Sequence, residues 1–78
     1  MSLIDYTLVR FTIGDLSSIS GIKTPALRMW EKRYDLLTPE RTDTNLRQYD
    51  LSQLQKLLNV RFLLQHGHKI SKIAEASQ

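Results

Sequence analysis

Apolar residues recur at helical spacing near the N-terminus of the chain: Ile13, Leu16 and Ile19. They follow Thr12-x-x-Asp15, which resembles a capping box, and they precede Gly21, a residue that often ends a helix. The pattern therefore predicts a helix of about two turns. Residues 8–11 have β-branched and aromatic character, so we expect a short lead-in strand or extended segment there.

A second helical pattern begins almost at once after Gly21. Thr24 is expected to be its N-cap, with Pro25 at the first helical position, where its missing N–H has no cost. Apolar residues at i, i+3 and i+7 extend the pattern: Leu27, Trp30 and Tyr34. Because the connection is so short, the two helices are predicted to form a helix-turn-helix.

The next segment predicts a small β-hairpin. Pro39 prevents further helix, and the polar residues 42–45 have the composition of a turn, with Arg41 and Arg47 on either side. We interpret this hairpin as a wing that follows the helix-turn-helix.

Two more helices are expected in the second half of the chain. Asp50 is the predicted N-cap of the longest one, Gln53 is placed to close a capping box, and Gly67 ends it. Its predicted apolar stripe is Leu51, Leu54, Leu58 and Phe62, widened by Leu57 and Leu64. A short helix then begins at 70–74, packed through Ile70, Ile73 and Ala74. The expected fold is mainly α with a small β-hairpin, a winged helix-turn-helix of four helices plus a wing.

Length and composition narrow the class of protein. With 78 residues the chain is expected to be a single domain, residues 1–78, with a small core. It has no cysteine, which excludes disulfides and thiolate zinc sites and suits a cytoplasmic protein. No apolar run approaches the roughly 20 residues of a membrane helix. Residues 1–6 are expected to be flexible or vector-derived, since the first three resemble a vector remnant.

The positive charge is concentrated in the middle of the chain. The net charge is only +3, but six of the eleven Lys and Arg residues lie between Lys23 and Arg47. Four carboxylates share that stretch, so its net charge is six minus four, or +2. A capped helix rich in cations and aromatics, directly before a polar hairpin, suits a helix in a DNA groove with a wing on the backbone.

Motifs in a defined order run along residues 11–76. They are Ile13-Gly14-x-Leu16, Gly21-Ile22, Leu27-Arg28-x-Trp30-Glu31, Leu36-Leu37-x-Pro39-x-Arg41, Arg47-x-Tyr49, and Gly67 followed by Ile70-x-x-Ile73. Together they resemble the DNA-binding domain of the MerR-type transcriptional regulators. Residues 30–34 are similar to the sub-branch that includes the vitamin-B12-associated light-response repressors of the CarA/LitR type. Asp35 and Asn45 stand where the family commonly has Gly, and both residue types tolerate a left-handed backbone.

The resemblance implies sequence-specific binding of double-stranded DNA at an inverted-repeat promoter site. It also implies transcriptional regulation by a homodimer, with RNA polymerase as an indirect partner. Family members dimerise through a long helix after this domain and carry a sensor domain beyond it, and neither is present in these residues. We therefore expect a fragment or a stand-alone DNA-binding product that holds no cofactor itself and has no membrane partner.

Ten residues are predicted to contact DNA. Arg28 comes first, because an Arg near the start of a recognition helix can reach a base edge or clamp a phosphate. Lys23 and Thr24 lie at the helix N-terminus, where backbone N–H groups can hold a phosphate, although Thr24 is equally explained as an N-cap. The other predicted contacts are Lys32, Arg33, Tyr34, Arg41, Asn45, Arg47 and Tyr49.

Simpler explanations compete with several of these assignments. Lys32 and Arg33 would complement the helix dipole without DNA, and the hairpin arginines could form a solvated face. Tyr34 and Tyr49 fit the core as well as a surface. Arg61, within an apolar part of the third helix, is predicted to hydrogen-bond carbonyls or a carboxylate where helices meet.

Catalysis and metal binding have little support in the sequence. The two histidines, His66 and His68, flank Gly67 with no carboxylate at ligand spacing, so no metal site is predicted. No nucleophile with a base and no phosphate-binding loop is present, so we expect no enzyme. Two alternatives to the regulator remain open. One is a protein-interaction adaptor on a winged-helix scaffold, and the other is an excisionase-like architectural protein that bends DNA.

Overall fold

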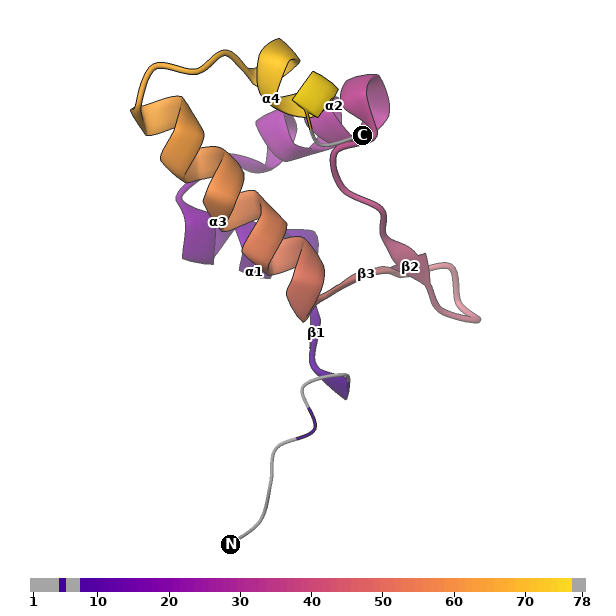
Figure 1. Cartoon of the computed structure of the whole chain (residues 1–78). Helices are drawn as coiled ribbons and strands as arrows, with labels where there is room; N and C mark the ends of the chain where they lie inside the picture. Colours follow the sequence, from indigo (N-terminus) through magenta and orange to yellow (C-terminus); the bar gives the residue numbers. More distant parts are fainter. Residues whose placement is uncertain (1–4, 6–7, 77–78) are drawn as a thin grey trace, which may run out of the picture.

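The computed structural model describes residue 5 and residues 8–76, and it has the predicted mainly helical architecture. Four helices and three short strands follow in the order β1 (Arg10–Phe11), α1 (Ile13–Ser20), α2 (Thr24–Tyr34), β2 (Glu40–Arg41), β3 (Arg47–Asp50), α3 (Leu51–Gln65) and α4 (Ile70–Ala76) (Figure 1). Apart from Asp5, the prediction for residues 1–6 lies outside the described residues.

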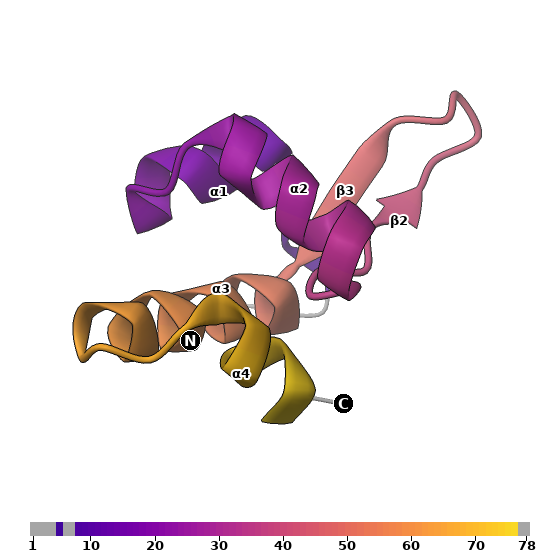
Figure 2. The same ribbon diagram turned by 90° about the horizontal axis from the view of Figure 1, so that it is seen from above.

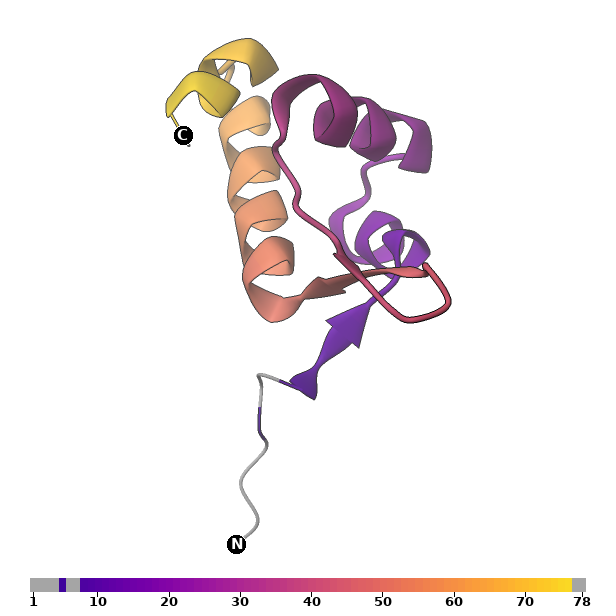
Figure 3. The same ribbon diagram turned by 90° about the vertical axis from the view of Figure 1, so that its right-hand side faces the viewer.

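The helices form two layers with the hairpin at one end. Figure 2 shows α1 and α2 on one side, α3 and α4 on the other, and the turn of the β2–β3 hairpin projecting beyond them. Figure 3 shows the chain leaving α2 and passing alongside α3 before it enters the hairpin. The core between these elements is formed by Leu16, Leu27, Trp30, Leu36, Leu37, Tyr49, Leu54, Leu57, Val60, Ile73 and Ala74.

The sheet has one strand more than the predicted hairpin. Its order is β1-β3-β2, with both pairs antiparallel, so the lead-in strand joins the hairpin through β3. Phe11 lies opposite Tyr49, and Arg10 lies opposite Asp50. An ion pair of 2.9 Å between Arg10 Nε and Glu40 Oε2 links the two outer strands. Strands of two residues carry almost no periodic signal, which is why the sequence did not predict this pairing.

α1 begins and ends at the predicted signals. Thr12 Oγ1 accepts the N–H of Asp15 at 3.0 Å, and Asp15 Oδ2 accepts the N–H of Thr12 at 2.9 Å, which confirms the capping box. Gly21 has φ 77 and donates its N–H to Ser17 O at 2.8 Å, a left-handed C-cap. The predicted apolar face is wrong at one position, since Ile19 is exposed and Ser20 is buried in its place.

The predicted N-cap of α2 is wrong by one residue. Lys23 is the cap, with extended backbone and no side-chain capping bond, while Thr24 is the first helical residue. The N–H groups of Ala26 and Leu27 both donate to the carbonyl of Lys23, at 3.0 and 3.2 Å. Pro25 still fits the first turn, because the first N–H groups of a helix have no intrahelical acceptor.

α3 starts at the predicted cap, but Gln53 does not complete a capping box. Asp50 Oδ1 accepts the hydroxyl of Ser52 at 2.6 Å and the N–H of Gln53 at 3.1 Å, and these bonds lower the pKa of Asp50. The Gln53 side chain turns to Thr38 instead, donating to its hydroxyl at 2.9 Å and accepting its N–H at 3.1 Å. The chain between α2 and the hairpin is thereby tied to the first turn of α3.

The predicted apolar stripe of α3 is partly wrong. The buried residues are Leu54, Leu57 and Val60, whereas Leu51 is 37% and Phe62 is 58% exposed. The buried face is therefore rotated from the predicted one toward the side that α1, β3 and α4 cover. Arg61, by contrast, confirms its prediction, because it donates to the carbonyl of Ser20 at 3.0 Å and so connects α3 to α1.

Candidate nucleic-acid interface

α2 directs its cations away from the core. Leu27 and Trp30 are buried on its inner face. The exposed residues of the same helix and its cap include four cations: Lys23, Arg28, Lys32 and Arg33. The helical periodicity of the sequence thus separates an apolar face from a basic one, as the sequence predicted.

The hairpin turn is held by its own hydrogen bonds. Thr42 donates its N–H to Leu46 O at 3.0 Å, and Asn45 donates its N–H to Thr42 O at 2.8 Å. Asn45 has φ 64, so it adopts the left-handed backbone that glycine adopts most readily. Arg41 and Arg47 are paired across the two strands, and Arg41 Nη1 donates to Asn45 Oδ1 at 3.0 Å. Both predicted arginines therefore flank the turn.

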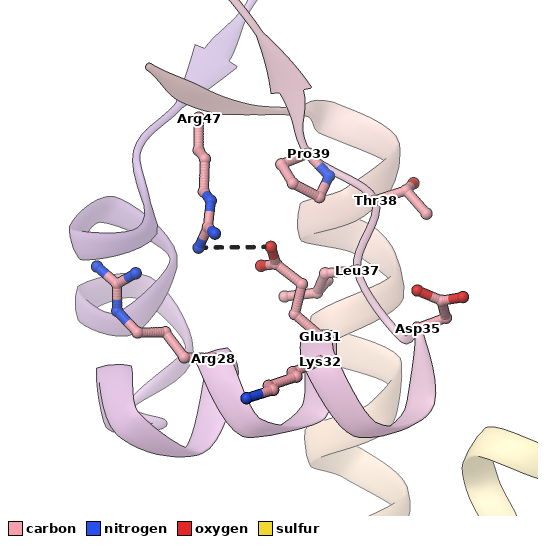
Figure 4. A pocket seen from close by; sticks show the side chains of 8 residues that line it. All are labelled: Arg28, Glu31, Lys32, Asp35, Leu37, Thr38, Pro39 and Arg47. Carbon is pink, nitrogen blue, oxygen red and sulfur yellow. Dashed lines mark ion pairs between the residues drawn. The ribbon is translucent and has the colours of Figure 1, made fainter. Parts of the chain in front are cut away.

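An open hollow of about 640 Å³ separates α2 from the hairpin. Figure 4 shows its lining side chains, with Arg47 reaching down from β3 toward the helix. Three of the predicted contact residues border this hollow: Arg28, Lys32 and Arg47. Two carboxylates and three uncharged residues complete the lining: Glu31, Asp35, Leu37, Thr38 and Pro39. The structure thus gathers cations from two separate elements around one concave surface.

Glu31 joins α2 to β3 at the edge of this hollow. The hydroxyl of Tyr49 donates to Glu31 Oε2 at 2.6 Å. Arg47 Nη1 lies 3.7 Å from Glu31 Oε1, the ion pair that the dashed line in Figure 4 marks. Burial, followed by the hydrogen bond to the Glu31 carboxylate, raises the pKa of Tyr49 from 10.0 to about 12. The phenol is therefore protonated near neutral pH and acts as a donor.

Tyr49 does not lie where a DNA-contacting residue would. Its side chain is fully buried, and its hydroxyl is engaged by Glu31. The sequence left this residue open between core and surface, and the structure assigns it to the core. We therefore correct the predicted contact set by removing Tyr49.

The other predicted contacts lie on the hairpin and at the two ends of α2. Arg41 and Asn45 are on the hairpin, and Lys23 and Thr24 are at the start of α2. Arg33 and the half-buried Tyr34 are at its far end, where the Arg33 guanidinium lies 5.7 Å from the Tyr34 ring centroid. They border a second hollow of about 300 Å³, shared with Ser71 and Glu75 of α4.

Sequence reasoning missed the part played by Glu31. It noted this residue only as part of the Leu27-Arg28-x-Trp30-Glu31 motif. The hydrogen bond to Tyr49 spans 18 residues of sequence, and no local pattern encodes it. One signal was available in the sequence: Glu31 follows Trp30 in a helix that is otherwise rich in cations. A carboxylate in that position suggests a specific partner.

Other kinds of site find no support in the part of the chain that the structure describes. Within residues 5 and 8–76, no three histidines or carboxylates lie close enough together to hold a metal ion. Across the same residues, no helix combines the length and apolar character that crossing a membrane would require.

Comparison with known proteins identifies the family. Residues 11–78 match the family model described as the MerR HTH family regulatory protein. The chain belongs to the MerR family. The resemblance to the MerR family that the sequence motifs indicated is therefore confirmed, and the match covers most of the chain.

Several curated relatives of this MerR-family chain are larger regulators. It is 30% identical over 63 residues to the HTH-type transcriptional regulator MlrA of Escherichia coli, covering 81% of this chain and 26% of MlrA. It is 31% identical over 65 residues to the HTH-type transcriptional repressor CarH of Myxococcus xanthus, covering 83% of this chain and 22% of CarH. The chain thus spans about a quarter of the length of these relatives. Because the two identities are so similar, the finer sub-branch stays a prediction.

Two solved structures share the fold of this MerR-family chain. A MerR-family transcriptional regulator from Bacillus cereus aligns with a TM-score of 0.79 and 23% identity, over 87% of this chain and 51% of that one. HiNmlR, described as a MerR family regulator lacking the sensor domain and bound to promoter DNA, aligns with a TM-score of 0.71 and 24% identity, over 88% of this chain and 55% of HiNmlR. The winged helix-turn-helix architecture predicted from the sequence is therefore confirmed.

Proposed function

We propose that this domain binds double-stranded DNA at promoters in a sequence-specific manner, as the DNA-binding part of a homodimeric transcriptional regulator. The observation that carries the proposal is the concave surface between α2 and the hairpin, which Arg28 and Lys32 border from the helix and Arg47 from the wing. A helix of α2's dimensions fits the major groove, and a hairpin beside it reaches the backbone or the adjacent minor groove.

The relatives support the same function. MlrA and CarH are named an HTH-type transcriptional regulator and repressor, and HiNmlR is described as bound to promoter DNA. An inverted-repeat operator, a dimerising segment beyond these residues, an indirect effect on RNA polymerase and a cytoplasmic location complete the proposal. The proposed role requires no catalysis.

The roles that we assign differ along the surface. Arg28 reads a base edge or clamps a phosphate, because its guanidinium can form paired hydrogen bonds with either. Arg41, Asn45 and Arg47 hold the backbone beside the wing. The two ends of α2 add phosphate contacts through Lys23, Thr24, Lys32, Arg33 and Tyr34.

The test is a titration of the purified domain into fluorescent duplexes of random and inverted-repeat sequence, repeated over a range of salt concentrations. Phosphate contacts make the logarithm of the affinity fall linearly with the logarithm of the salt concentration. We expect binding that weakens steeply with salt, and a loss of roughly ten-fold or more for Arg28→Ala.

Lys56→Ala is the matched control. It removes one positive charge from α3, where Lys56 borders a separate hollow shared with Ile73 and Ala76 of α4. An equal loss in both variants would mean that only the total charge matters. If the folded domain bound no duplex even at low salt, the proposed function would be wrong and a protein-interaction adaptor would become the better explanation.

A further inference from the structure

Glu31 stands among the cations that we propose to contact DNA, yet its carboxylate repels phosphate. Its side chain is only 14% exposed, and its two oxygens have different partners. Oε2 accepts the hydroxyl of Tyr49 at 2.6 Å, and Oε1 faces Arg47 Nη1 at 3.7 Å. The carboxylate therefore has one close hydrogen bond and one loose ion pair.

The hydrogen bond fixes the position of the carboxylate. Tyr49 is fully buried in β3, opposite Phe11 of β1, so its ring has no room to follow a moving partner. A short bond from a phenol to a carboxylate is among the stronger side-chain hydrogen bonds. Glu31 is thus held in place from the core side.

The ion pair is a weaker hold on Arg47. Its 3.7 Å separation is longer than a direct N–H···O hydrogen bond, and the Arg47 side chain is 38% exposed. Partly exposed ion pairs of this kind contribute little net free energy. Arg47 can therefore leave Glu31 at small cost when a better acceptor arrives.

A phosphate is such an acceptor, because its oxygens can accept paired hydrogen bonds from a guanidinium as a carboxylate does. The cations beside Arg47 also favour an anion at this place. Arg28 and Lys32 border the same hollow and attract an anion there, whereas Asp35, the remaining carboxylate of the lining, lies at the C-cap of α2.

We propose that Glu31 restrains Arg47 in the free protein and releases it to a DNA phosphate on binding, which makes Glu31 a positioning residue that limits affinity. This inference rests on the proposed function. Glu31 orients Arg47 before DNA arrives. Because the ion pair between them is lost on binding, DNA binding is weaker than it would be without Glu31. The restraint acts on every duplex equally, so it lowers non-specific binding as well as specific binding.

The test is a double-mutant cycle with Glu31→Gln and Arg47→Ala, using a random-sequence duplex at low salt. Gln retains an oxygen that can accept the Tyr49 hydroxyl but removes the charge. We expect E31Q to bind roughly two- to five-fold more tightly than the wild type. In the R47A background, the gain from E31Q should fall to that expected from removing one carboxylate near the DNA, because the part that acts through Arg47 is lost.

Glu40→Gln is the matched control, since it removes one negative charge from the wing strand β2 while Glu40 pairs with Arg10 rather than with Arg47. Its effect on affinity should be independent of Arg47. An equal gain from E31Q in the wild-type and R47A backgrounds, no gain in the wild-type background, or a loss there would each overturn the inference while the proposed function stands. Absence of binding by the wild type would overturn both.

A second measurement needs no substitution. On addition of duplex to the wild-type chain, the Nε–H resonance of Arg47 should shift as its acceptor changes, while the ring resonances of Tyr49 keep their positions. An unchanged Arg47 resonance in the saturated complex would contradict the exchange, even if the E31Q variant failed to fold.

Discussion

Arg61 of α3 donates a 3.0 Å hydrogen bond to the carbonyl oxygen of Ser20, the last residue of α1. Ser20 is itself buried and accepts the N–H of Ile22 through its hydroxyl at 3.1 Å. Ser17 donates its hydroxyl to the carbonyl of the same Ile22 at 2.6 Å. The turn of the helix-turn-helix is therefore fixed by side chains on both sides rather than by its own backbone alone.

Replacing Arg61 with Met should lower the free energy of unfolding by about 1 to 3 kcal/mol, because it leaves the Ser20 carbonyl without its charged donor. Met keeps most of the apolar stem, so packing changes little. Urea denaturation followed by circular dichroism measures the difference. An unchanged midpoint would mean that water replaces the guanidinium at no cost.

Asp35 occupies a left-handed position that suits glycine better. It caps α2 with φ 52 and donates its N–H to Trp30 O, and its carboxylate lies at the negative end of the helix dipole. Asp35→Gly should therefore raise the free energy of unfolding by about 1 kcal/mol. Asp35→Ala, which keeps the backbone strain, is the control, and a gain of equal size in both variants would point to charge alone. Thermal denaturation of the three proteins separates these outcomes.

Tyr49 should make the stability of the domain fall at high pH. Its pKa is about 12 in the folded chain and 10.0 in the reference state. Below the lower value the phenol is protonated in both states, so its stabilisation is complete. Above it the unfolded chain releases the proton first, so the free energy of unfolding decreases as the pH rises toward the higher value.

Urea denaturation of the wild type and of Tyr49→Phe at several alkaline pH values tests this. The difference in unfolding free energy between the two should shrink as the pH rises through that window. Parallel curves would show that the decrease comes from other groups, such as lysines.

The ion pair between Arg10 and Glu40 should contribute little, despite its 2.9 Å distance. Both side chains are partly exposed, at 30% and 54%, so solvent screens their attraction. Glu40→Gln is expected to change the free energy of unfolding by less than about 1 kcal/mol. Denaturation at low and high salt is the measurement, and a larger, salt-sensitive loss would indicate that this pair, more than backbone pairing, holds β1 to the sheet.

Arg41 should contribute one phosphate contact if the wing lies on DNA. Arg41→Ala is then expected to reduce the slope of log affinity against log salt by about 0.9, whereas Lys56→Ala should leave the slope unchanged. Fluorescence anisotropy over a salt series gives both slopes. Equal slopes for R41A and the wild type would place the tip of the wing away from the backbone.

The features that the sequence predicted well are those encoded within a few residues. The capping box at Thr12, the left-handed Gly21 and the cap at Asp50 depend on neighbours within one helical turn. Positive φ at Asp35 and Asn45 likewise follows from residue types that tolerate it. Such signals remain readable without tertiary contacts.

Apart from the cap of α2, which is Lys23 rather than the adjacent Thr24, the features that it missed depend on contacts across the fold. The Gln53 side chain could bond the backbone N–H of its own N-cap, Asp50. It bonds Thr38 instead, which lies 15 residues earlier in the chain. Phe62 fits a helical stripe, yet the elements that cover α3 select a different face, and Phe62 stacks on His66 with ring centroids 4.2 Å apart. In the candidate interface, the cations could be predicted from their positions in the second helix and the hairpin, whereas the Tyr49–Glu31 bond joins α2 to β3 across 18 residues.

Asp50 is the last residue of β3 and also the residue that caps α3, so no linker separates the wing from the longest helix. A strand that passes directly into a helix cannot pivot without breaking the bonds of the cap, and the Thr38–Gln53 pair ties the incoming side of the hairpin to the same turn. We therefore expect the wing and α3 to move as one unit. A tilt imposed at the hairpin would then shift α3 as well, and with it the contact between α3 and α4.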